Sequence, residues 1–349
     1  MKSGVRIVQY NVLSSALSDP KYYTRCDSEN LDPQIREDRV RHKLQQEMSK
    51  ESIICLQEVS LDWVAKFTPF FESMDYGFVV RNYGHSYNGY MGVGIVYPRG
   101  VYELVELELI QVGDQIPKPA ASEHSDPKFY GLENLIDLKY WFGSILKHMT
   151  FGQDSEDHWN MARYKKNTLI IAKFAVIEED IKEFTVACYH MPCDFRRPTI
   201  MMLHLVQVLK LIQKYESVIL AGDLNLLPDS PYYHVIRTGK LPKKFVIQGS
   251  PTAVTDWFPD DLKSMDSAFV LANGREPYFT NYAYNQRSKK TFTGTLDYIF
   301  MSKNGWSQEV NTDPLPNELN PAKVLGASLP NQTEPSDHLL IAVDLTLLS

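Results

Sequence analysis

The sequence predicts a single α/β domain with sheets at its centre, and three observations support this. Short runs rich in apolar and β-branched residues recur along the 349-residue chain, as buried strands require. Between some of them lie longer segments with apolar residues three to four apart, the pattern of amphipathic helices. The runs extend from residue 5 to residue 345 without a clear linker, so one domain accounts for the chain.

The predicted strands share a high content of Val, Ile and aromatic residues. They are residues 5–10, 52–57, 90–98, 168–176, 183–189, 217–222, 295–302 and 339–345.

Three segments are predicted to be helices, and two of them carry clear helical signals. The first starts after Asp32, a favoured N-cap residue, with Pro33 at the first helical position. The second covers residues 198–215 and repeats apolar residues at helical spacing. Its predicted buried side consists of Ile200, Leu203, Val206, Leu209 and Ile212.

Two segments interrupt this pattern. Residues 113–126 are rich in proline, serine and acidic residues and are expected to form a loop. They lead into residues 129–149, a predicted helix with an aromatic stripe, for which a core helix is favoured over a lid. We expect an insertion around residues 113–162. A second polar, proline-rich loop is expected at residues 314–335.

Composition limits the classes of function. The net charge of −7 argues against nonspecific adhesion to nucleic acid, although a local basic cleft could still bind a polyanion. The four cysteines are scattered and are expected to be reduced thiols. The N-terminus lacks an apolar signal segment and no apolar run reaches transmembrane length. We therefore expect a cytoplasmic protein without membrane insertion, with the nucleus and organelles left open.

Polar side chains stand where predicted strands end. In "VILAGDLNLLPDS", Asp223 and Asn225 follow an apolar run, and residues two apart in an extended chain face the same side. Asp and Asn are also common turn residues, so this stretch alone leaves both interpretations open. Polar side chains also stand at or near the ends of other predicted strands, and Asp297 lies inside the predicted strand 295–302. The further residues are Asn11, Glu58, His190, Asp297, Asp337 and His338.

These residue types suit one chemistry. The oxygen donors of Asn11, Glu58 and Asp337 suit Mg²⁺. Histidine can polarise a phosphoryl oxygen or move a proton, and a neighbouring Asp would hold its tautomer. The sequence contains neither a nucleophile elbow nor a phosphate-binding P-loop. Water activated by a carboxylate and a metal is therefore the expected nucleophile.

Seven motifs resemble the endonuclease/exonuclease/phosphatase superfamily, the deoxyribonuclease-I-like fold. They are "QYNVLSS", "CLQEVS", "YMGVGIVYP", "YHMPCDF", "LAGDLNLLPDS", "GTLDYIF" and "SDH", and they occur in the family's order along essentially the whole chain. The resemblance implies a four-layer α/β sandwich of two packed mixed β-sheets flanked by helices. It also implies that residues 1–349 form a single catalytic domain.

The resemblance implies a metal site that contains Glu58 as principal ligand, with Asn11, and with Asp337 assisting. The implied cofactor is Mg²⁺, for which Mn²⁺ can substitute. DNA-repair members often carry an Asp two residues after the first Asn, where this chain has Leu13. This departure argues against a repair endonuclease.

The resemblance also implies the catalytic roles. Asp223 would position or deprotonate the attacking water, and Asn225 would hold that water or a phosphate oxygen. His190 and His338 would polarise the phosphate, and Asp297 would orient His338.

Within the superfamily, "GDLNLLPDSPYYHVIRTGKL" and "PYFTNYAYNQRSKKTFTGTLDYIFMS" resemble the carbon-catabolite-repressor deadenylase branch, which includes nocturnin, the Angel proteins and 2′-phosphodiesterases. In poly(A)-specific relatives, the residue matching Phe292 stacks on an adenine; a core aromatic residue is the alternative. Because Phe292 stands five residues before Asp297, we expect a short turn to bring its ring beside the reacting phosphate. The loop "YHMPCDFRRP" departs from the deadenylase pattern and argues against a strict poly(A) preference.

Basic residues near the predicted site favour a polyanionic substrate, although a solvated charged face is the alternative. The predicted substrate-binding residues are Arg196, Arg197, Lys290, Phe292 and Asn167. Arg287 and Lys289 lie close to Lys290 in the sequence.

The first functional hypothesis is a Mg²⁺-dependent 3′-to-5′ exoribonuclease that acts as a monomer on RNA 3′ ends. The second is a phosphatase or phosphodiesterase for a small nucleotide, such as a 2′-phosphorylated dinucleotide, a 2′,5′-oligoadenylate or a cyclic phosphate end. An inactive relative that serves as a binding module is a third alternative, and lipid phosphodiesterases of this fold are a fourth.

Overall fold

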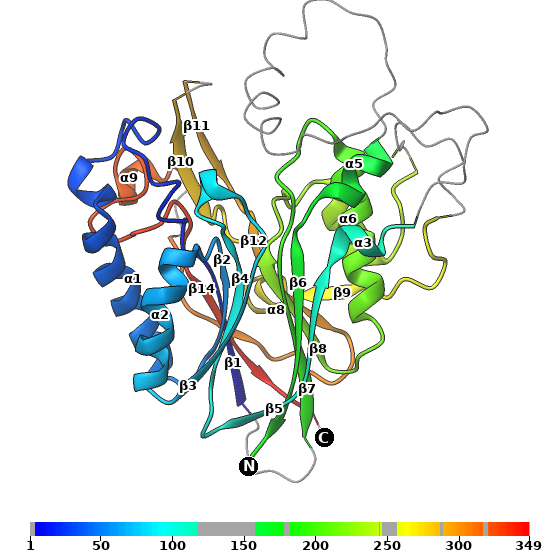
Figure 1. Cartoon of the computed structure of the whole chain (residues 1–349). Coiled ribbons are helices and arrows are strands. Elements are labelled where there is room, and N and C mark those ends of the chain that lie inside the picture. Colours follow the sequence, from blue (N-terminus) through cyan, green and yellow to red (C-terminus); the bar gives the residue numbers. More distant parts are fainter. Residues whose placement is uncertain are drawn as a thin grey trace, which may run out of the picture.

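Two six-stranded sheets pack face to face, and helices cover their outer faces (Figure 1). The structure is a computed structural model that describes residues 4–117, 158–177, 182–243, 245, 257–286, 289–316 and 320–348. The predicted four-layer α/β sandwich is confirmed.

The first sheet brings the ends of β1 and β2 together. In it, β1 and β2 are parallel, and Asn11 at the end of β1 pairs with Gln57 at the end of β2. Glu58 follows directly, so both predicted metal-site residues leave the same edge of the sheet. In spatial order the strands are β13 (Asn311–Thr312), β14 (Ile341–Thr346), β1 (Gly4–Asn11), β2 (Ile53–Gln57), β4 (Gly92–Pro98) and β3 (Tyr76–Asn82).

The second sheet repeats this arrangement. Parallel strands β7 and β8 end with His190 opposite Asp223, and the antiparallel strand β12 begins with Asp297 opposite Asp223. In spatial order the strands are β5 (Tyr102–Gln111), β6 (Thr168–Val176), β7 (Glu183–His190), β8 (Val218–Asp223), β12 (Asp297–Ser302) and β9 (Met265–Ser267). A separate hairpin consists of β10 (Asn281–Asn285) and β11 (Lys290–Gly294).

The helices in the described part of the chain vary from one turn to four turns. They are α1 (Pro33–Met48), α2 (Leu61–Ser73), α3 (Val112–Gln115), α5 (His158–Tyr164), α6 (Pro198–Ile212), α7 (Pro231–Thr238), α8 (Ala268–Asn273) and α9 (Ala322–Leu325), with 3₁₀ turns at Ser28–Leu31 and Ser86–Asn88. As predicted, Asp32 caps α1, since its side chain accepts hydrogen bonds from the backbone N–H groups of Gln34 and Ile35. The predicted apolar side of α6 is buried. Further faces of α6 are buried as well, because α3, α5 and α7 contact it.

Alternating side chains on each strand form the layers of the core. In the first sheet, Ile7 and Ile53 face the second sheet, whereas Val8 and Ile54 pack towards α1 and α2. A third apolar cluster joins the second sheet to α6 and α7. Because both sheets are covered on both faces, their central strands are almost wholly apolar, which made them recognisable in the sequence.

Three expectations about local structure were wrong. Strand β12 begins at Asp297, not at residue 295, because the backbone N–H groups of Leu296 and Asp297 donate to Oγ1 of Thr280 instead of to a neighbouring strand (2.9 and 3.0 Å). The predicted loops at 113–126 and 314–335 contain the helical turns α3 and α9. The helix predicted at residues 129–149 lies outside the described residues, as does most of the expected insertion at 113–162. The single-domain assignment to residues 1–349 therefore stays a prediction.

All four cysteines are free thiols, as expected. Among the helices of the described ranges, none is both long enough and apolar enough to cross a lipid bilayer.

Candidate active site

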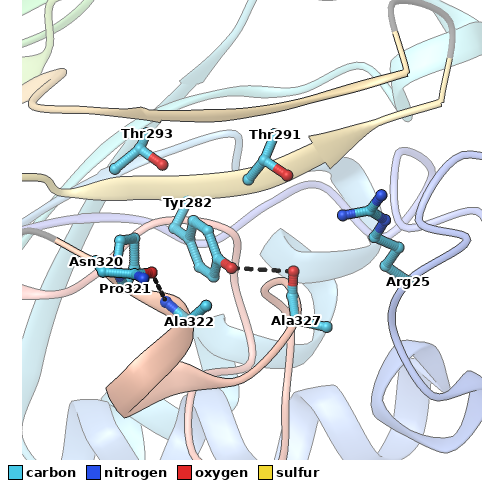
Figure 2. Close-up of a pocket in the computed structure, with 8 residues that line it drawn as sticks. All are labelled: Arg25, Tyr282, Thr291, Thr293, Asn320, Pro321, Ala322 and Ala327. Carbon is cyan, nitrogen blue, oxygen red and sulfur yellow. Dashed lines mark hydrogen bonds between the residues drawn. The ribbon is translucent and has the colours of Figure 1, made fainter.

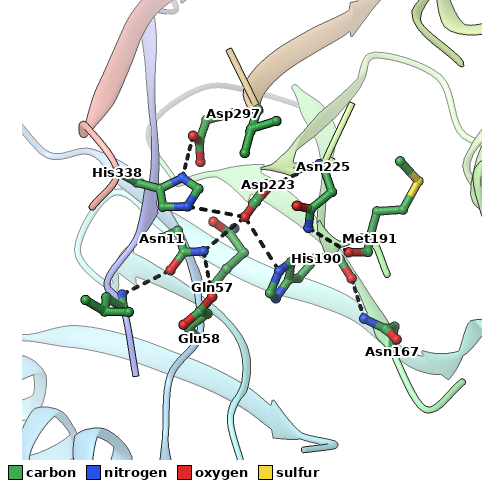
Figure 3. A network of polar contacts seen from close by, with 12 residues as sticks. Asn11, Gln57, Glu58, Asn167, His190, Met191, Asp223, Asn225, Asp297 and His338 are labelled. Atoms are coloured by element: carbon green, nitrogen blue, oxygen red, sulfur yellow. Dashed lines mark hydrogen bonds and ion pairs between the residues drawn. The ribbon is translucent and has the colours of Figure 1, made fainter. Parts of the chain in front are cut away.

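Six of the predicted site residues come together at one edge of the sandwich (Figure 3). Strands β1, β2, β7 and β8 end at this edge, and β12 and β14 begin there. The residues that meet are Asn11, Glu58, His190, Asp223, Asp297 and His338.

Asp223 is buried at the centre of this group. Its Oδ2 accepts a hydrogen bond from Nδ2 of Asn11 at 3.0 Å. The same oxygen lies 3.5 Å from Nε2 of His190 and 3.7 Å from Nε2 of His338. Oδ1 accepts a hydrogen bond from the backbone N–H of Asn225 at 3.0 Å. One carboxylate thus faces an amide and two imidazoles, an arrangement suited to holding and deprotonating a water molecule.

Both histidines are oriented through Nδ1. Nδ1 of His338 lies 2.7 Å from Oδ2 of Asp297, which also accepts a hydrogen bond from the hydroxyl of Thr280 at 2.6 Å. Nδ1 of His190 lies 2.9 Å from the hydroxyl oxygen of Tyr83. These contacts leave Nε2 of each ring directed at Asp223 (Figure 3).

The electrostatics of the site favour a charged imidazole beside Asp223. Burial by itself lowers the pKa of His338, but the negative charges of Asp297 and Asp223 outweigh burial and raise the pKa well above its usual value. Burial raises the pKa of Asp223 above its usual value, while His338 and His190 act in the opposite direction. The raised pKa of His338 favours its protonated form, which can stabilise negative charge on a phosphoryl group.

The Glu58 side of the site offers hard oxygen donors. Nδ2 of Asn11 donates to Oε1 of Glu58 at 3.2 Å, and the backbone N–H of Ser14 donates to Oε2 at 3.1 Å. Oδ1 of Asn11 accepts a hydrogen bond from the backbone N–H of Leu13 at 3.0 Å. Each of these oxygens keeps a second lone pair, so the donor set fits Mg²⁺.

A second group also has metal-ligand spacing. The ligand atoms of Asp223, Asp297 and His338 all lie within 4.8 Å of one another. However, Asp297 and His338 are already hydrogen-bonded to each other, and a metal held by those two atoms would replace that bond. The Glu58 side is the better candidate, because carboxylate and amide oxygens suit a hard cation.

Asp337 enters the site through a different contact. Its Oδ2 accepts a hydrogen bond from the hydroxyl of Tyr23 at 3.0 Å, and its backbone carbonyl accepts one from the N–H of Tyr282 at 3.0 Å. Its role as a metal ligand stays a prediction.

The predicted amide residues support the end of β7. Nδ2 of Asn225 donates to the carbonyl of Met191 at 2.9 Å, and Nδ2 of Asn167 donates to the carbonyl of His190 at 2.9 Å. Their Oδ1 atoms stay available as acceptors in this geometry. Substrate contact by Asn167 stays a prediction, and the structure adds a positioning contact beneath His190 (Figure 3).

Phe292 lies in strand β11, and only residues 295 and 296 connect this strand to β12, which begins with Asp297; the place of its ring beside a reacting phosphate stays a prediction. Its ring is half-buried and lies against Gly294. A Cβ atom at Gly294 would stand 3.0 Å from the Phe292 ring and 2.9 Å from Cδ2 of Leu227. A side chain at this position would have to displace the Leu227 side chain or the Phe292 ring.

The predicted basic residues differ in their surroundings. Nε of Arg197 lies 3.1 Å from Oδ1 of Asp194, which compensates its charge. Arg196 and Lys290 are exposed. Arg287 lies outside the described residues. The rim of the site therefore carries fewer uncompensated cations than the sequence suggested.

A chain of amides beneath the site was not predicted. Nε2 of Gln57 donates to Oε1 of Gln9 at 2.8 Å, and Nε2 of Gln9 donates to Oδ1 of Asp297 at 3.1 Å. The chain links the two sheets, since Asp297 belongs to the second sheet. A glutamine near the end of each of two otherwise apolar strands was the signal that could have revealed it.

Three site segments contain a non-glycine residue with positive φ. The values are 53° at Leu13, 58° at Glu58 and 48° at Asn225. Non-glycine residues adopt this left-handed region only when their surroundings impose it, and such strain concentrates at functional sites.

Arg36 holds two of the site's loops together. Its side chain is fully buried, and Nη2 donates to the carbonyls of Val12 and Leu13, both at 2.7 Å. Its Nε donates to the carbonyl of Pro335 at 2.7 Å, and the hydroxyl of Ser336 donates to the carbonyl of Asn11 at 2.7 Å. The loop after β1 is thereby fixed to the segment that carries His338.

Two cavities flank the β10–β11 hairpin. Figure 2 shows the one bordered by Arg25, Thr291 and Thr293, with a volume of about 430 Å³. The two threonines alternate with Phe292 along β11, so their side chains point away from the face that carries the Phe292 ring, and Thr293 borders both cavities. The other cavity, of about 510 Å³, borders Leu227 and Gly294, which are next to the Phe292 ring.

Comparisons with known proteins give one family match and several relatives. A family model described as Endonuclease/Exonuclease/phosphatase family matches residues 8–338. Carbon catabolite repressor protein 4 homolog 4 of Arabidopsis thaliana is 31% identical over 131 residues, which are 38% of this chain and 27% of that protein. 2′,5′-Phosphodiesterase 12 of Rattus norvegicus is 33% identical over 135 residues, 37% of this chain and 19% of that protein. The matched segment thus spans less than a third of either curated relative.

Among solved structures, the crystal structure of ANGEL2, a 2′,3′-cyclic phosphatase, in complex with adenosine-2′,3′-vanadate has a TM-score of 0.69 to this chain. The superposition covers 99% of this chain and 96% of that chain at 18% sequence identity, so it shows a shared fold.

Proposed function

We propose that this chain, which belongs to the endonuclease/exonuclease/phosphatase family, is a Mg²⁺-dependent phosphodiesterase that removes nucleotides from RNA 3′ ends. Hydrolysis of a phosphoric ester is the chemistry of the family, and the relatives agree with the carbon-catabolite-repressor branch predicted from the motifs. The observation that carries the proposal is the buried Asp223 carboxylate, which faces His190, His338 and Asn11 at one point.

Asp223 supplies the base in this mechanism. It accepts a proton from a water molecule that attacks the phosphorus atom, and the bond from phosphorus to the leaving ribose oxygen breaks. His338 and His190 contact non-bridging phosphoryl oxygens through Nε2 and stabilise the charge that develops there. Asp297 holds His338 in the required orientation.

Glu58 and Asn11 would hold the divalent cation, with Asp337 assisting. When bound, Mg²⁺ supplies Lewis-acid polarisation of the phosphoryl group, and Mn²⁺ is expected to substitute. The positive φ at Glu58 turns its carboxylate out of the β2 strand direction towards Asn11.

A small-nucleotide phosphatase or phosphodiesterase is the second candidate. The pairing of Arg197 with Asp194 favours it, because fewer free cations at the rim suit a short substrate better than a long polyanion. ANGEL2, which shares the fold, is described as a 2′,3′-cyclic phosphatase.

A substrate panel distinguishes the two candidates. The protein is incubated with Mg²⁺ and labelled RNA, DNA, 2′,5′-oligoadenylate and RNA with a 2′,3′-cyclic phosphate end, and products are identified by mass. We expect stepwise release of nucleoside 5′-monophosphates from RNA 3′ ends, and no turnover after chelation. Turnover of small nucleotides alone would support the second candidate. Full turnover in excess chelator would rule out the metal requirement.

Phe292→Ala tests the stacking contact. One stacked base contributes about 1–3 kcal/mol, so substrate binding or kcat/KM should fall by that free energy while Mg²⁺ affinity stays unchanged. Kinetics on RNAs ending in adenosines and in uridines measure the effect, with Phe292→Tyr as the control that keeps the ring. If Phe292→Ala cleaves both RNAs as well as the wild type, Phe292 is only a packing residue.

A further inference from the structure

The cavity of about 510 Å³ beside Gly294, here called the Tyr278 pocket, has walls from three chain segments and from two further residues, Tyr233 and Val270. Residues 227–229 follow Asn225, and residues 293–295 precede Asp297. Residues 275–278 connect α8 to β10. Two of its walls thus continue directly from chain segments that carry site residues.

A stacked cation and ring border the pocket. The guanidinium carbon of Arg275 lies 3.6 Å from the centroid of the Tyr278 ring. Tyr278 is 39% exposed, although aromatic side chains usually bury most of their surface. An exposed ring paired with an arginine is a surface on which a nucleobase stacks.

The rest of the lining suits a flat ring that carries an amino group. Leu227, Val270 and Pro277 supply apolar surface. Glu276 is buried, and its Oε1 accepts a hydrogen bond from the hydroxyl of Tyr233 at 2.8 Å. The side chain of Ser267 also hydrogen-bonds this carboxylate, which has about four acceptor positions, so Glu276 keeps capacity for an amino group of a base.

The Phe292 ring lies next to Gly294, one of the residues that line the pocket. Gly294 lines the pocket, and a Cβ atom at this position would stand 3.0 Å from that ring. Because Phe292 and Gly294 are two apart in β11, they share one face of the hairpin. A nucleotide bound at Phe292 would therefore have the Tyr278 pocket as its immediate neighbour.

We propose that the Tyr278 pocket binds the base of the nucleotide adjacent to the one held at Phe292, with amino-bearing bases preferred over uracil. This inference rests on the proposed function and defines the substrate class as at least two linked nucleotides. The cavity shown in Figure 2 borders Thr291 and Thr293, whose side chains alternate with Phe292 along β11, and it takes no part in this proposal.

Binding of fluorescein-labelled hexaadenylate tests the pocket independently of catalysis. Anisotropy is measured with Mg²⁺ in the Asp223→Asn protein, with and without Tyr278→Ala. We expect Tyr278→Ala to weaken hexaadenylate binding about 5- to 150-fold, and hexauridylate to bind more weakly than hexaadenylate. Tyr278→Phe should retain the affinity. Arg275→Ala should weaken binding, whereas Arg99→Ala, which removes an exposed arginine after β4, should not.

A second assay separates the two proposals. Tyr278→Ala in the otherwise wild-type chain should hydrolyse bis(p-nitrophenyl) phosphate, which carries no nucleobase, as fast as the wild type. Unchanged hexaadenylate affinity in Tyr278→Ala, or no hexaadenylate binding at all, would overturn the proposal that the pocket binds a base. Hydrolysis of bis(p-nitrophenyl) phosphate would in that case still support the proposed phosphodiesterase function. Suppose that hexaadenylate binding depends on Tyr278 but the wild type hydrolyses neither hexaadenylate nor bis(p-nitrophenyl) phosphate. This result would overturn the proposed function, whereas the proposal that the pocket binds a base would remain.

Discussion

Asp223→Asn is expected to lower kcat by about 10²- to 10⁴-fold, the usual effect of losing a general base. The amide keeps the size of the side chain and an oxygen that can accept the hydrogen bond from the N–H of Asn225. It cannot take the proton from water. Single-turnover rates on RNA and on bis(p-nitrophenyl) phosphate measure the effect without interference from product release.

The matched control is Asp62→Asn, which neutralises a half-exposed carboxylate on α2 next to Lys66. Its rate should stay within about twofold of the wild type, because exposed ion pairs contribute little. Near-native hydrolysis by Asp223→Asn would show that another group activates the water.

Glu58→Gln is expected to weaken Mg²⁺ binding by more than about 100-fold. Even residues that only orient metal ligands typically contribute 10- to 100-fold, and Glu58 is the principal ligand in the proposed site. The rate at saturating Mg²⁺ should fall much less than in Asp223→Asn, because the base is intact. Calorimetric titration with Mg²⁺ and the dependence of the rate on Mg²⁺ concentration measure both effects.

Glu72→Gln, an exposed residue near the end of α2, provides the control for Glu58. Its Mg²⁺ affinity should equal that of the wild type. Unchanged Mg²⁺ affinity in Glu58→Gln would place the cation elsewhere, and the group formed by Asp223, Asp297 and His338 would become the leading candidate.

The sequence predicted the parts of the fold that depend on local pattern. Strands such as residues 168–176 are apolar on both faces because they are covered on both faces, so composition alone revealed them. The meeting of Asn11 with Glu58, and of His190 with Asp223, follows from parallel pairing, which ends two strands at one edge. Strands β3 and β5 were not predicted, because polar and partly exposed residues interrupt their apolar pattern.

Contacts between segments far apart in the chain could not be predicted. Tyr83 meets His190 across 107 positions and Gln9 meets Asp297 across 288, and both contacts depend on how the two sheets pack. No local pattern specifies that packing. Arg197 and Asp194 are only three positions apart, so their ion pair is local. It was not predicted, because the basic residues near the site were considered without their acidic neighbours.

The site residues are divided between the two sheets, so catalytic activity requires that both sheets are formed and packed together. Asn11, Glu58 and His338 come with the first sheet, and the remaining three site residues come with the second sheet. Neither sheet alone can place His338 against Asp297 or Asn11 against Asp223. During refolding, circular dichroism would record the formation of each sheet, whereas the return of activity would mark the moment at which the two sheets dock.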